Sequence, residues 1–445
     1  MTTTRTTPTA IPSRVTGPET ADVVVVGGGI AGLVAAVAAA EAPSRPRVVL
    51  LDAHAPGGRA RVDEVAGFRF NRGPRALYRG GPLEGFLVGH GISVHGGPPP
   101  TGGGRALDGG VLHRMPGSPV DAARTTLFSL REKAAVGRAF ARLPRLDPTM
   151  AAGRPAAELP DLLGLRGAPA AFLLALVRLA TYIEAPGELD GAAALAQLQA
   201  ATSSGVRYLD GGWSTILDGL EHTARALGVA IRPGTRVQAV GAPDPAGRRS
   251  VTTAAGTVDA AAVVLAGLSP AAATALVADA PPSWGAVGPP VTAACLELGL
   301  RTAPPVRFVL GVDEPVYLSV HCPPADLAPP GGAVVHLMRY HAVGGATSSE
   351  DDRAALHALM ARAGITPDLV VEERFLASMT VAHAIPRADT GGRSGRPSIA
   401  PPEAPGLFLG GDWVGPEGLL ADAAAASGLA AGAHAAARCA TMARR

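Results

Sequence analysis

The sequence has few aromatic and few charged residues, and no long uninterrupted apolar run. Aromatic residues make up 4% of the 445 residues and charged residues 17%, whereas hydrophobic residues, mostly alanine, reach 47%. No run approaches the roughly 18 apolar residues that a membrane-spanning helix needs. With a net charge of +2 and no basic run interleaved with aromatics, the sequence gives no reason to expect a nucleic-acid partner. Its length allows two or three domains, at roughly 150 residues each.

Cysteine and lysine are also scarce. The three cysteines, Cys295, Cys322 and Cys439, lie far apart and form no CxxC pair. This argues against a metal site or a dithiol centre and predicts a protein of the reducing cytoplasm. Lys133 is the single lysine among many arginines. Residues 1–20 are rich in Thr, Pro and Ser without an apolar core, which predicts a disordered leader rather than a signal peptide.

The first ordered segment reads as a βαβ unit. Residues 22–26 (DVVVV) are a β-branched run typical of a buried parallel strand. A glycine-rich turn and an alanine-rich helix to about residue 41 follow, and then a second strand at residues 47–51. The whole segment has the length of about 30 residues that such a unit needs.

The turn after the first strand carries the spacing GxGxxG, formed by Gly27, Gly29 and Gly32. The first glycine permits the tight turn, the second lets the backbone approach a pyrophosphate, and the third lets the helix pack close to the strand. The helix begins near Ile30 and Ala31, where free N–H groups and the helix dipole attract phosphate. These five residues are therefore predicted to bind a dinucleotide.

An acidic residue completes the motif. Asp52 ends the second strand, where a carboxylate can accept hydrogen bonds from ribose hydroxyls. A negative charge at this position disfavours a 2′-phosphate. We therefore expect FAD or NAD rather than NADP.

The residues after Asp52 distinguish between these two. The segment Gly57-Gly58-Arg59 resembles the flavoprotein superfamily of amine oxidases, protoporphyrinogen oxidases and phytoene desaturases. The resemblance implies FAD, with Gly58 and Arg59 among its contacts. Residues 70–78 (FNRGPRALY) are similar to the stretch that passes near the flavin ring in relatives. Here the implied contacts are Gly73, Pro74, Arg75 and Ala76, with Arg75 able to reach the substrate side.

Two later segments extend the resemblance. Gly211-Gly212-Trp213, a helix and then Thr235-Arg236-Val237 are similar to the central segment of the superfamily, which implies that the backbone of Val237 contacts adenine. Residues 406–413 (GLFLGGDW) and 418–428 are similar to its C-terminal FAD motif. The resemblance implies contacts at Gly411, Asp412, Gly418, Leu419 and Leu420.

The C-terminal motif has a clear physical logic. Asp412 ends a strand, where it can accept a hydrogen bond from a ribityl hydroxyl. The helix after it would direct its N-terminus at the flavin C2 carbonyl, where the helix dipole stabilises the negative charge of reduced flavin. Relatives of the monoamine oxidase type attach flavin to a cysteine shortly before this motif. No cysteine lies between Cys322 and Cys439, so we expect non-covalent FAD.

These segments predict an α/β fold in which two discontinuous domains alternate along the chain. A Rossmann-like FAD-binding domain of the glutathione-reductase type is expected at residues 21–100, 205–285 and 395–445. A mixed α+β substrate domain is expected to be inserted at residues 101–204 and 286–394. No motif that we recognise covers the inserted domain.

Three functions fit this fold. The first is a desaturase or dehydrogenase that transfers a hydride from a lipophilic or natural-product substrate to the flavin. Residues 406–413 and the pattern Gly-Pro-x-Ala-Leu-Tyr resemble phytoene desaturase-like proteins most. The apolar residues 172–177 fit either the wall of a tunnel for such a substrate or an ordinary core helix.

The second function is a flavin amine oxidase that produces an imine and hydrogen peroxide. Relatives of this kind commonly place a lysine near the flavin, on a strand of the inserted domain. The corresponding strand, residues 291–298 (VTAACLEL), has none, which argues against this function without excluding it.

The third function is a redox-neutral isomerase or a non-catalytic flavin-binding partner. The substrate is expected to be a small and apolar molecule, and contact with a membrane surface and the oligomeric state stay open. The later strands of the inserted domain, where substrate contacts are expected, contain His321, His336, Arg339, Tyr340, His341 and His383. The sequence assigns none of them as an acid or base.

Overall fold

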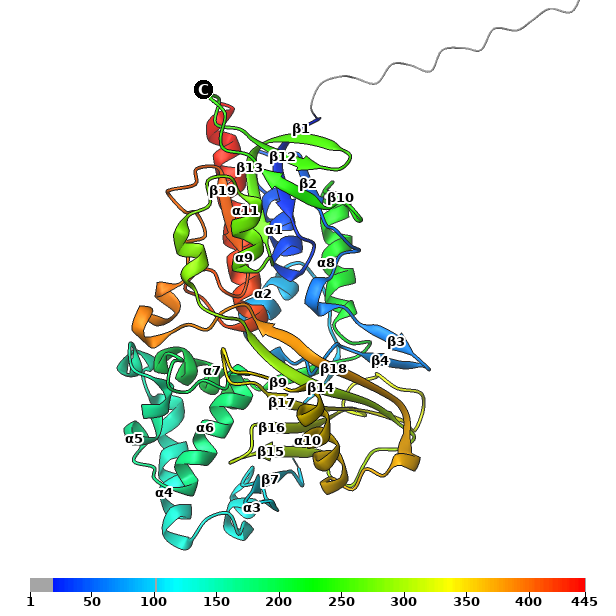
Figure 1. Cartoon of the computed structure of the whole chain (residues 1–445), viewed down its shortest axis with the longest axis vertical. Helices are drawn as coiled ribbons and strands as arrows, with labels where there is room; N and C mark the ends of the chain where they lie inside the picture. Colours follow the sequence, from blue (N-terminus) through cyan, green and yellow to red (C-terminus); the bar gives the residue numbers. More distant parts are fainter. Residues whose placement is uncertain (1–18, 101, 445) are drawn as a thin grey trace, which may run out of the picture.

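The computed structural model describes residues 19–100 and 102–444, and it is built around two seven-stranded sheets. Figure 1 shows the first sheet, with α1, α8 and α11, at the end of the molecule that carries the C-terminus. The second sheet and the helices α4 to α6 lie at the opposite end. No helix among the described residues is long and apolar enough to cross a membrane.

The first sheet has the order β10-β2-β1-β13-β12-β11, with β19 also paired to β13. Its central strands run parallel, whereas β12 pairs antiparallel with both β13 and β11. The strands are β1 Glu19–Val26, β2 Val48–Leu51, β10 Ala230–Arg232, β11 Val237–Val240, β12 Arg249–Thr253, β13 Gly256–Ala266 and β19 Leu407–Gly410. The helices that accompany it are α1 Ile30–Ala40, α2 Pro82–Gly89, α8 Ser214–Ala226, α9 Pro270–Leu276 and α11 Leu420–Met442.

Both faces of this sheet are buried, which explains why β1 is a continuous run of valines. Val23 and Val25 pack into the core formed with α1, α8 and α11. Val24 and Val26 point to the other face, into the core that contains α9 and Trp284. Residues from the start, the middle and the end of the chain thus share one core.

The second sheet has the order β18-β14-β17-β16-β15-β7-β8 and is antiparallel except between β15 and β7. One face packs on α10, and the other packs on α6. The strands are β7 Arg105–Asp108, β8 Val111–Arg114, β14 Val291–Leu300, β15 Phe308–Gly311, β16 Val316–Cys322, β17 Ala333–Tyr340 and β18 Val370–Ala382. The helices of this part are α3 Pro119–Arg124, α4 Leu130–Arg142, α5 Leu159–Leu163, α6 Ala168–Thr181, α7 Gly191–Ser203 and α10 Ser349–Arg362.

Smaller elements connect the two halves. A three-stranded sheet of β5 Leu77–Tyr78, β9 Val206–Leu209 and β6 Gly96–Gly97 and a hairpin of β3 Asp63–Val65 and β4 Phe68–Phe70 lie between them. The short 3-10 helices are Gly58–Ala60, Leu143–Arg145, Pro148–Ala151, Ala156–Glu158, Pro282–Ala286, Pro367–Leu369, Ala388–Thr390 and Gly392–Gly395. The architecture confirms the predicted α/β fold class, with a Rossmann-like sheet and an inserted mixed α+β part.

The structure corrects one sequence expectation and decides between two alternatives left open by the sequence. The predicted disordered leader extends too far, because Glu19 and Thr20 already belong to β1 and pair with β13; residues 1–18 lie outside the described part of the chain. The apolar residues 172–177 form part of α6, and Phe172 and Ala175 pack into the core against the second sheet. This stretch is therefore a core helix and not the wall of a tunnel.

Helices α1 and α11 approach each other closely because α11 has glycines at the contact. A Cβ on Gly428 would lie 2.4 Å from the Ala31 carbonyl oxygen, and one on Gly432 would lie 2.2 Å from that of Ala35. Real Cβ atoms do not approach a backbone oxygen so closely. Either substitution must therefore push the two helices apart.

We predict that Gly432→Ala destabilises the protein by about 1–3 kcal/mol, the usual cost of overpacking a core. Gly137→Ala is the matched control, since Gly137 also lies inside a helix but has no atom within 4 Å of an added Cβ. The control should stabilise by about 0.5–1 kcal/mol, because alanine favours helix. Urea unfolding measures both, and equal effects would show that the α1–α11 contact is not tight.

Candidate active site

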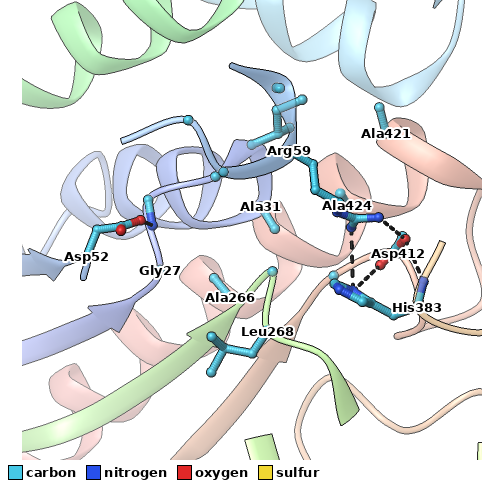
Figure 2. A pocket seen from close by; sticks show the side chains of 18 of the residues that line it. Gly27, Ala31, Asp52, Arg59, Ala266, Leu268, His383, Asp412, Ala421 and Ala424 are labelled. Atoms are coloured by element: carbon cyan, nitrogen blue, oxygen red, sulfur yellow. Dashed lines mark hydrogen bonds and ion pairs between the residues drawn. The ribbon is translucent and has the colours of Figure 1, made fainter. Parts of the chain in front are cut away.

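A cavity of about 660 Å³ lies where the first sheet meets the second half of the molecule. Segments from the start, the middle and the end of the chain line it (Figure 2). The segments that contribute most are residues 26–31, 51–54, 57–60, 74–78, 235–237, 266–268 and 420–422. Its size falls within the range of small-molecule and cofactor sites.

The glycine loop forms one wall of the cavity. Gly27 has a φ of +104°, and a Cβ there would lie 2.1 Å from the Ala266 carbonyl oxygen, so only glycine fits. Gly29 is the N-cap of α1 and faces open space; no side chain caps the helix, and no acidic residue lies in its first turn. The N–H groups of this helix start are therefore free to bind an anion.

Asp52 holds the glycine loop as well as lining the cavity. Its Oδ2 accepts a hydrogen bond of 2.6 Å from the Gly28 N–H, and its Oδ1 accepts one of 2.7 Å from the His54 N–H. A carboxylate has about four acceptor positions, so two remain for a ligand such as a ribose. The sequence predicted that Asp52 binds a ribose, but not that it holds the glycine loop.

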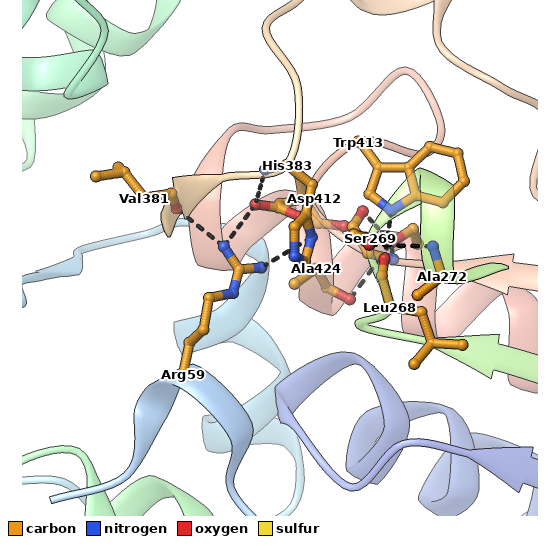
Figure 3. Close-up of polar contacts among 12 residues, drawn as sticks. Arg59, Leu268, Ser269, Ala272, Val381, His383, Asp412, Trp413 and Ala424 are labelled. Atoms are coloured by element: carbon orange, nitrogen blue, oxygen red, sulfur yellow. Dashed lines mark hydrogen bonds and ion pairs between the residues drawn. The ribbon is translucent and has the colours of Figure 1, made fainter. Parts of the chain in front are cut away.

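Asp412 lies at the centre of a buried ion-pair cluster (Figure 3). The Arg59 guanidinium donates to its Oδ2 at 2.9 Å and also to the Val381 carbonyl at 3.0 Å. His383 approaches the same carboxylate with its backbone N–H at 3.1 Å and with Nδ1 at 3.0 Å. Burial alone would raise the pKa of Asp412, but Arg59 and His383 outweigh it and hold this pKa far below its usual range.

A second carboxyl, Asp422, lines the cavity from the first turn of α11. Its Oδ1 accepts a hydrogen bond of 3.0 Å from the Leu83 N–H, at the start of α2. Burial raises the pKa of Asp422 to about 6, and the hydrogen bond from Leu83 opposes the shift. Asp422 lies within the C-terminal motif at residues 418–428, but the sequence assigned it no role, because its place in the cavity depends on how α11 packs against α2.

Aromatic side chains form the wall near α11. Tyr78 donates a hydrogen bond of 2.6 Å to the Ala180 carbonyl, and burial raises the pKa of its phenol. Tyr182 ends α6 in the left-handed conformation with a φ of +61°, which is uncommon for a residue other than glycine. The Trp213 Nε1 is buried with no hydrogen-bond partner among the described residues. This wall is therefore largely apolar, with a few polar atoms available for contact.

Most of the residues that were predicted to bind the cofactor line this one cavity. They are Gly27, Gly29, Ile30, Ala31, Asp52, Gly58, Arg59, Pro74, Arg75, Ala76, Val237, Gly411, Asp412 and Leu420. The remaining four, Gly32, Gly73, Gly418 and Leu419, are not among its lining residues.

Three of these four act through packing or backbone conformation. A Cβ on Gly32 would lie 1.8 Å from the Gly27 carbonyl oxygen, so this glycine permits the close helix–strand contact that the motif predicts. Gly418 has a φ of +67°, and Leu419 is the N-cap of α11, so both shape the entry into that helix. Gly32, Gly418 and Leu419 therefore support the wall without forming it.

Gly73 corrects a prediction. The sequence placed its backbone next to the flavin, but its N–H donates a hydrogen bond of 2.7 Å to the buried carboxylate of Glu297. A Cβ on Gly73 would lie 2.3 Å from the Met379 sulfur. Gly73 is therefore a packing glycine between the two halves of the molecule.

Only one of the candidate histidines reaches the cavity. His383 lines it because this residue directly follows β18, whose end at Ala382 reaches the cavity. His341 is held by Asp352 at 2.9 Å. His321 and His336 are fully buried in the second sheet, and their ring nitrogens have no hydrogen-bond partner among the described residues. The latter two are therefore core histidines whose pKa burial lowers, although Nδ1 of His336 lies 3.4 Å from Oε1 of the equally buried Glu297.

The comparisons with known proteins agree with this geometry at the level of the fold. Residues 25–87 match the family described as the NAD(P)-binding Rossmann-like domain. No curated protein matches the chain. The matched residues run from β1 through the glycine loop and Asp52 to α2.

Solved structures match over almost the whole chain. An oxidoreductase from Methanosarcina mazei is 18% identical with a TM-score of 0.70, covering 92% of this chain and 99% of that one. A protein from Exiguobacterium sp. 255-15, provisionally assigned as a protoporphyrinogen oxidase, is 19% identical with a TM-score of 0.71, covering 93% and 98%. Putrescine oxidase with bound putrescine is 14% identical with a TM-score of 0.69, covering 94% and 99%.

At these identities the likeness establishes a shared fold. The names of the three structures agree with the amine oxidase and protoporphyrinogen oxidase side of the predicted resemblance. None of the three is named a phytoene desaturase, so the comparisons do not support that closer resemblance.

The buried histidines predict an acid-sensitive fold. Burial, together with the charges of Arg75 and Arg374, lowers the pKa of His336 to about 3. The unfolded chain binds this proton below about pH 6.5 and the folded chain does not, so stability falls as the pH drops from about 6.5. One such histidine contributes up to about 1.4 kcal/mol per pH unit.

We therefore predict that His336→Gln loses less stability than the wild type between pH 7 and pH 5, even if it starts less stable. His222→Gln, at an exposed position on α8, is the control and should keep the wild-type pH dependence. Urea unfolding at several pH values measures this. Parallel curves for all three proteins would mean that His336 has the same pKa in the folded and the unfolded chain, which would contradict the prediction.

Proposed function

We propose that this protein is an FAD-dependent oxidoreductase that holds its flavin without a covalent bond. One observation carries the proposal: a single cavity is lined both by the glycine loop with Asp52 and by Asp412 with the start of α11. A site for NAD or NADP needs only the first of these walls. The second wall, at the far end of the chain, supports a longer dinucleotide.

The lining residues fit FAD along its length. Asp52 and Val237 would hold the adenosine, and the N-terminus of α1 would hold the pyrophosphate. Arg59 and Asp412 lie further along the cavity (Figure 2), where they would meet the ribityl chain. Leu420 begins α11 at the flavin end, where the helix dipole favours negative charge.

Bound FAD would supply a two-electron acceptor for a hydride from substrate carbon. The chain's own residues bind and orient the reactants and limit the access of water. Arg75 extends from the glycine-rich segment toward Trp213, with its guanidinium 5.9 Å from the ring centre. Tyr78 and Tyr182 cover the adjacent wall, and burial raises the pKa of both phenols.

We infer that the reaction is a desaturation or dehydrogenation of a largely apolar substrate. The wall near α11 is formed by side chains such as Leu83, Tyr182 and Leu420, which suit an apolar molecule. Lys133, the only lysine, lies on α4 and donates to the Ala123 carbonyl, so it does not line this cavity. The similarity to phytoene desaturase-like proteins rests on sequence motifs alone.

An amine oxidase is the alternative. Putrescine oxidase shares the fold, and the carboxyl of Asp422 gives the cavity one group that can pair with an ammonium. Release of hydrogen peroxide from amines in air would favour this alternative. Reduction of the flavin by an apolar substrate, without peroxide from amines, would favour the dehydrogenase.

A redox-neutral isomerase or a flavin-binding partner without activity is the third candidate. Anaerobic titration with candidate substrates separates it from the other two, because only a redox reaction bleaches the flavin. All three cysteines are free and buried, which fits the proposed cytoplasmic location.

The first test is the visible absorption spectrum of the purified protein, before and after denaturation. We expect flavin absorption bands at ~450 nm. After the denatured protein is removed, the flavin should remain in the supernatant, because it is not covalently bound. A colourless protein that takes up no added FAD, but binds NAD, would contradict the proposal. Flavin that stays with the precipitate would contradict non-covalent attachment alone.

Asp52→Ala tests the adenosine end of the proposed site. Loss of hydrogen bonds to a charged acceptor costs about 1.5–3 kcal/mol each, so we predict at least a ten-fold higher dissociation constant for FAD. Asp368→Ala, at an exposed position outside the cavity, is the control and should bind FAD normally. Fluorescence titration of the apoproteins measures this, and normal FAD binding by Asp52→Ala would refute the ribose role.

A further inference from the structure

The segment formed by β8, α3 and α4, residues 111–146, has an unusual charge. It contains seven basic residues and two acidic ones, a net of +5, whereas the whole chain carries only +2. The rest of the molecule is therefore net negative. We call the exposed face of this segment the α3–α4 surface; Figure 1 shows α3 and α4 at the end of the molecule opposite the C-terminus.

Hydrogen bonds and an ion pair join the three elements into one surface. Lys133 on α4 donates from Nζ to the Ala123 carbonyl on α3 at 2.8 Å. Arg114 on β8 pairs with Asp121 on α3 at 2.9 Å. The charges of this segment are therefore held together rather than dispersed.

Three arginines of α4 lie along one edge of the helix. Arg131, Arg138 and Arg142 are separated by seven and four residues, which places them within about 40° of each other at 3.6 residues per turn. All three are exposed, and none forms an ion pair with a carboxylate of the described residues. Glu132, the only acid of this helix, is engaged in the capping box with Ser129. Nothing in the described part of the fold neutralises this row.

Exposed aliphatic side chains accompany the arginines. Leu130 at the start of α4 is 84% exposed, Val120 on α3 58% and Val111 on β8 55%. Among the large hydrophobic side chains outside residues 111–150, only Val88 is more exposed than Val120 and Val111. Single exposed aliphatic side chains are common on protein surfaces, so these three support an interaction surface only together with the arginine row of the same segment.

Cations together with exposed aliphatic groups match the boundary of an anionic lipid bilayer. Arginine is attracted to lipid phosphates, and aliphatic side chains gain by entering the acyl boundary. A nucleic acid fits less well, because it offers no place for Leu130 or Val120. The segment also lacks exposed aromatics for base stacking, since Phe128 is buried and Phe140 half-buried.

We propose that the α3–α4 surface docks this protein on the surface of an anionic membrane. Arg131, Arg138 and Arg142 contact lipid phosphates, and Leu130 and Val120 enter the boundary between headgroups and acyl chains. This docking does not depend on the proposed redox function.

The test is co-sedimentation of the full-length protein with lipid vesicles. We expect binding to vesicles that contain phosphatidylglycerol, little binding to phosphatidylcholine alone, and release by salt. Each arginine contributes roughly five-fold, so the triple variant Arg131→Gln/Arg138→Gln/Arg142→Gln should bind about 100-fold more weakly. The control, Arg45→Gln/Arg225→Gln/Arg301→Gln, removes the same charge at exposed positions elsewhere and should bind like the wild type.

A second variant tests the aliphatic part. Leu130→Ser/Val120→Ser keeps every charge, and we expect about ten-fold weaker binding to the anionic vesicles. These side chains are exposed, so the melting temperature should not change and a folding defect is easily recognised.

Other outcomes would overturn the proposal. If the arginine control weakens vesicle binding as much as the α4 triple variant does, the attraction to the vesicles is non-specific. Binding to duplex DNA but not to vesicles, lost in the α4 triple variant, would reassign the surface to nucleic acid. Self-association lost in that variant would reassign it to a second copy of the chain. Absence of binding to anionic vesicles at low salt would refute docking outright.

Discussion

The buried carboxylate of Asp412 is the interaction on which the site depends. An isolated charge at such depth would be costly, and it is stable here because Arg59 and His383 bond to it directly. These residues come from three distant parts of the chain: a loop after β2, the end of β18 and the end of β19. The contacts that compensate the charge of Asp412 therefore join the two sheets. They also define the middle of the cavity.

The sequence predicted the walls of the cavity that follow strand ends. The turn after β1, Asp52 after β2 and Asp412 after β19 could be located because each motif fixes a residue relative to its own strand. The sequence named His383 as one of several candidates but could not single it out, and it assigned no role to Asp422 or Tyr182. The positions of these residues depend on the length of β18 and on how α11 and α6 pack. Gly73 was misassigned for the same reason: its partner Glu297 lies on another sheet.

The fold alone leaves the chemistry open. Structures of very different names share it at identities below 20%, so the walls that would hold FAD say little about the substrate. Information on the substrate must come from the wall near α11, where Asp422, Tyr78 and Tyr182 are the polar groups. A carboxyl whose pKa burial raises to about 6 changes charge near neutral pH. The charge of this wall therefore depends on pH.

Charge is handled in opposite ways in the cavity and on the α3–α4 surface. In the cavity, Asp412 is buried and its charge is compensated by direct partners. On the α3–α4 surface, three aligned arginines remain exposed, and the one acid of the helix is used in its capping box. With +5 concentrated in residues 111–146 and a negative remainder, the protein has a strong charge asymmetry. In the field of an anionic surface such a molecule turns its basic end toward the surface, so the asymmetry sets its orientation before any specific contact forms.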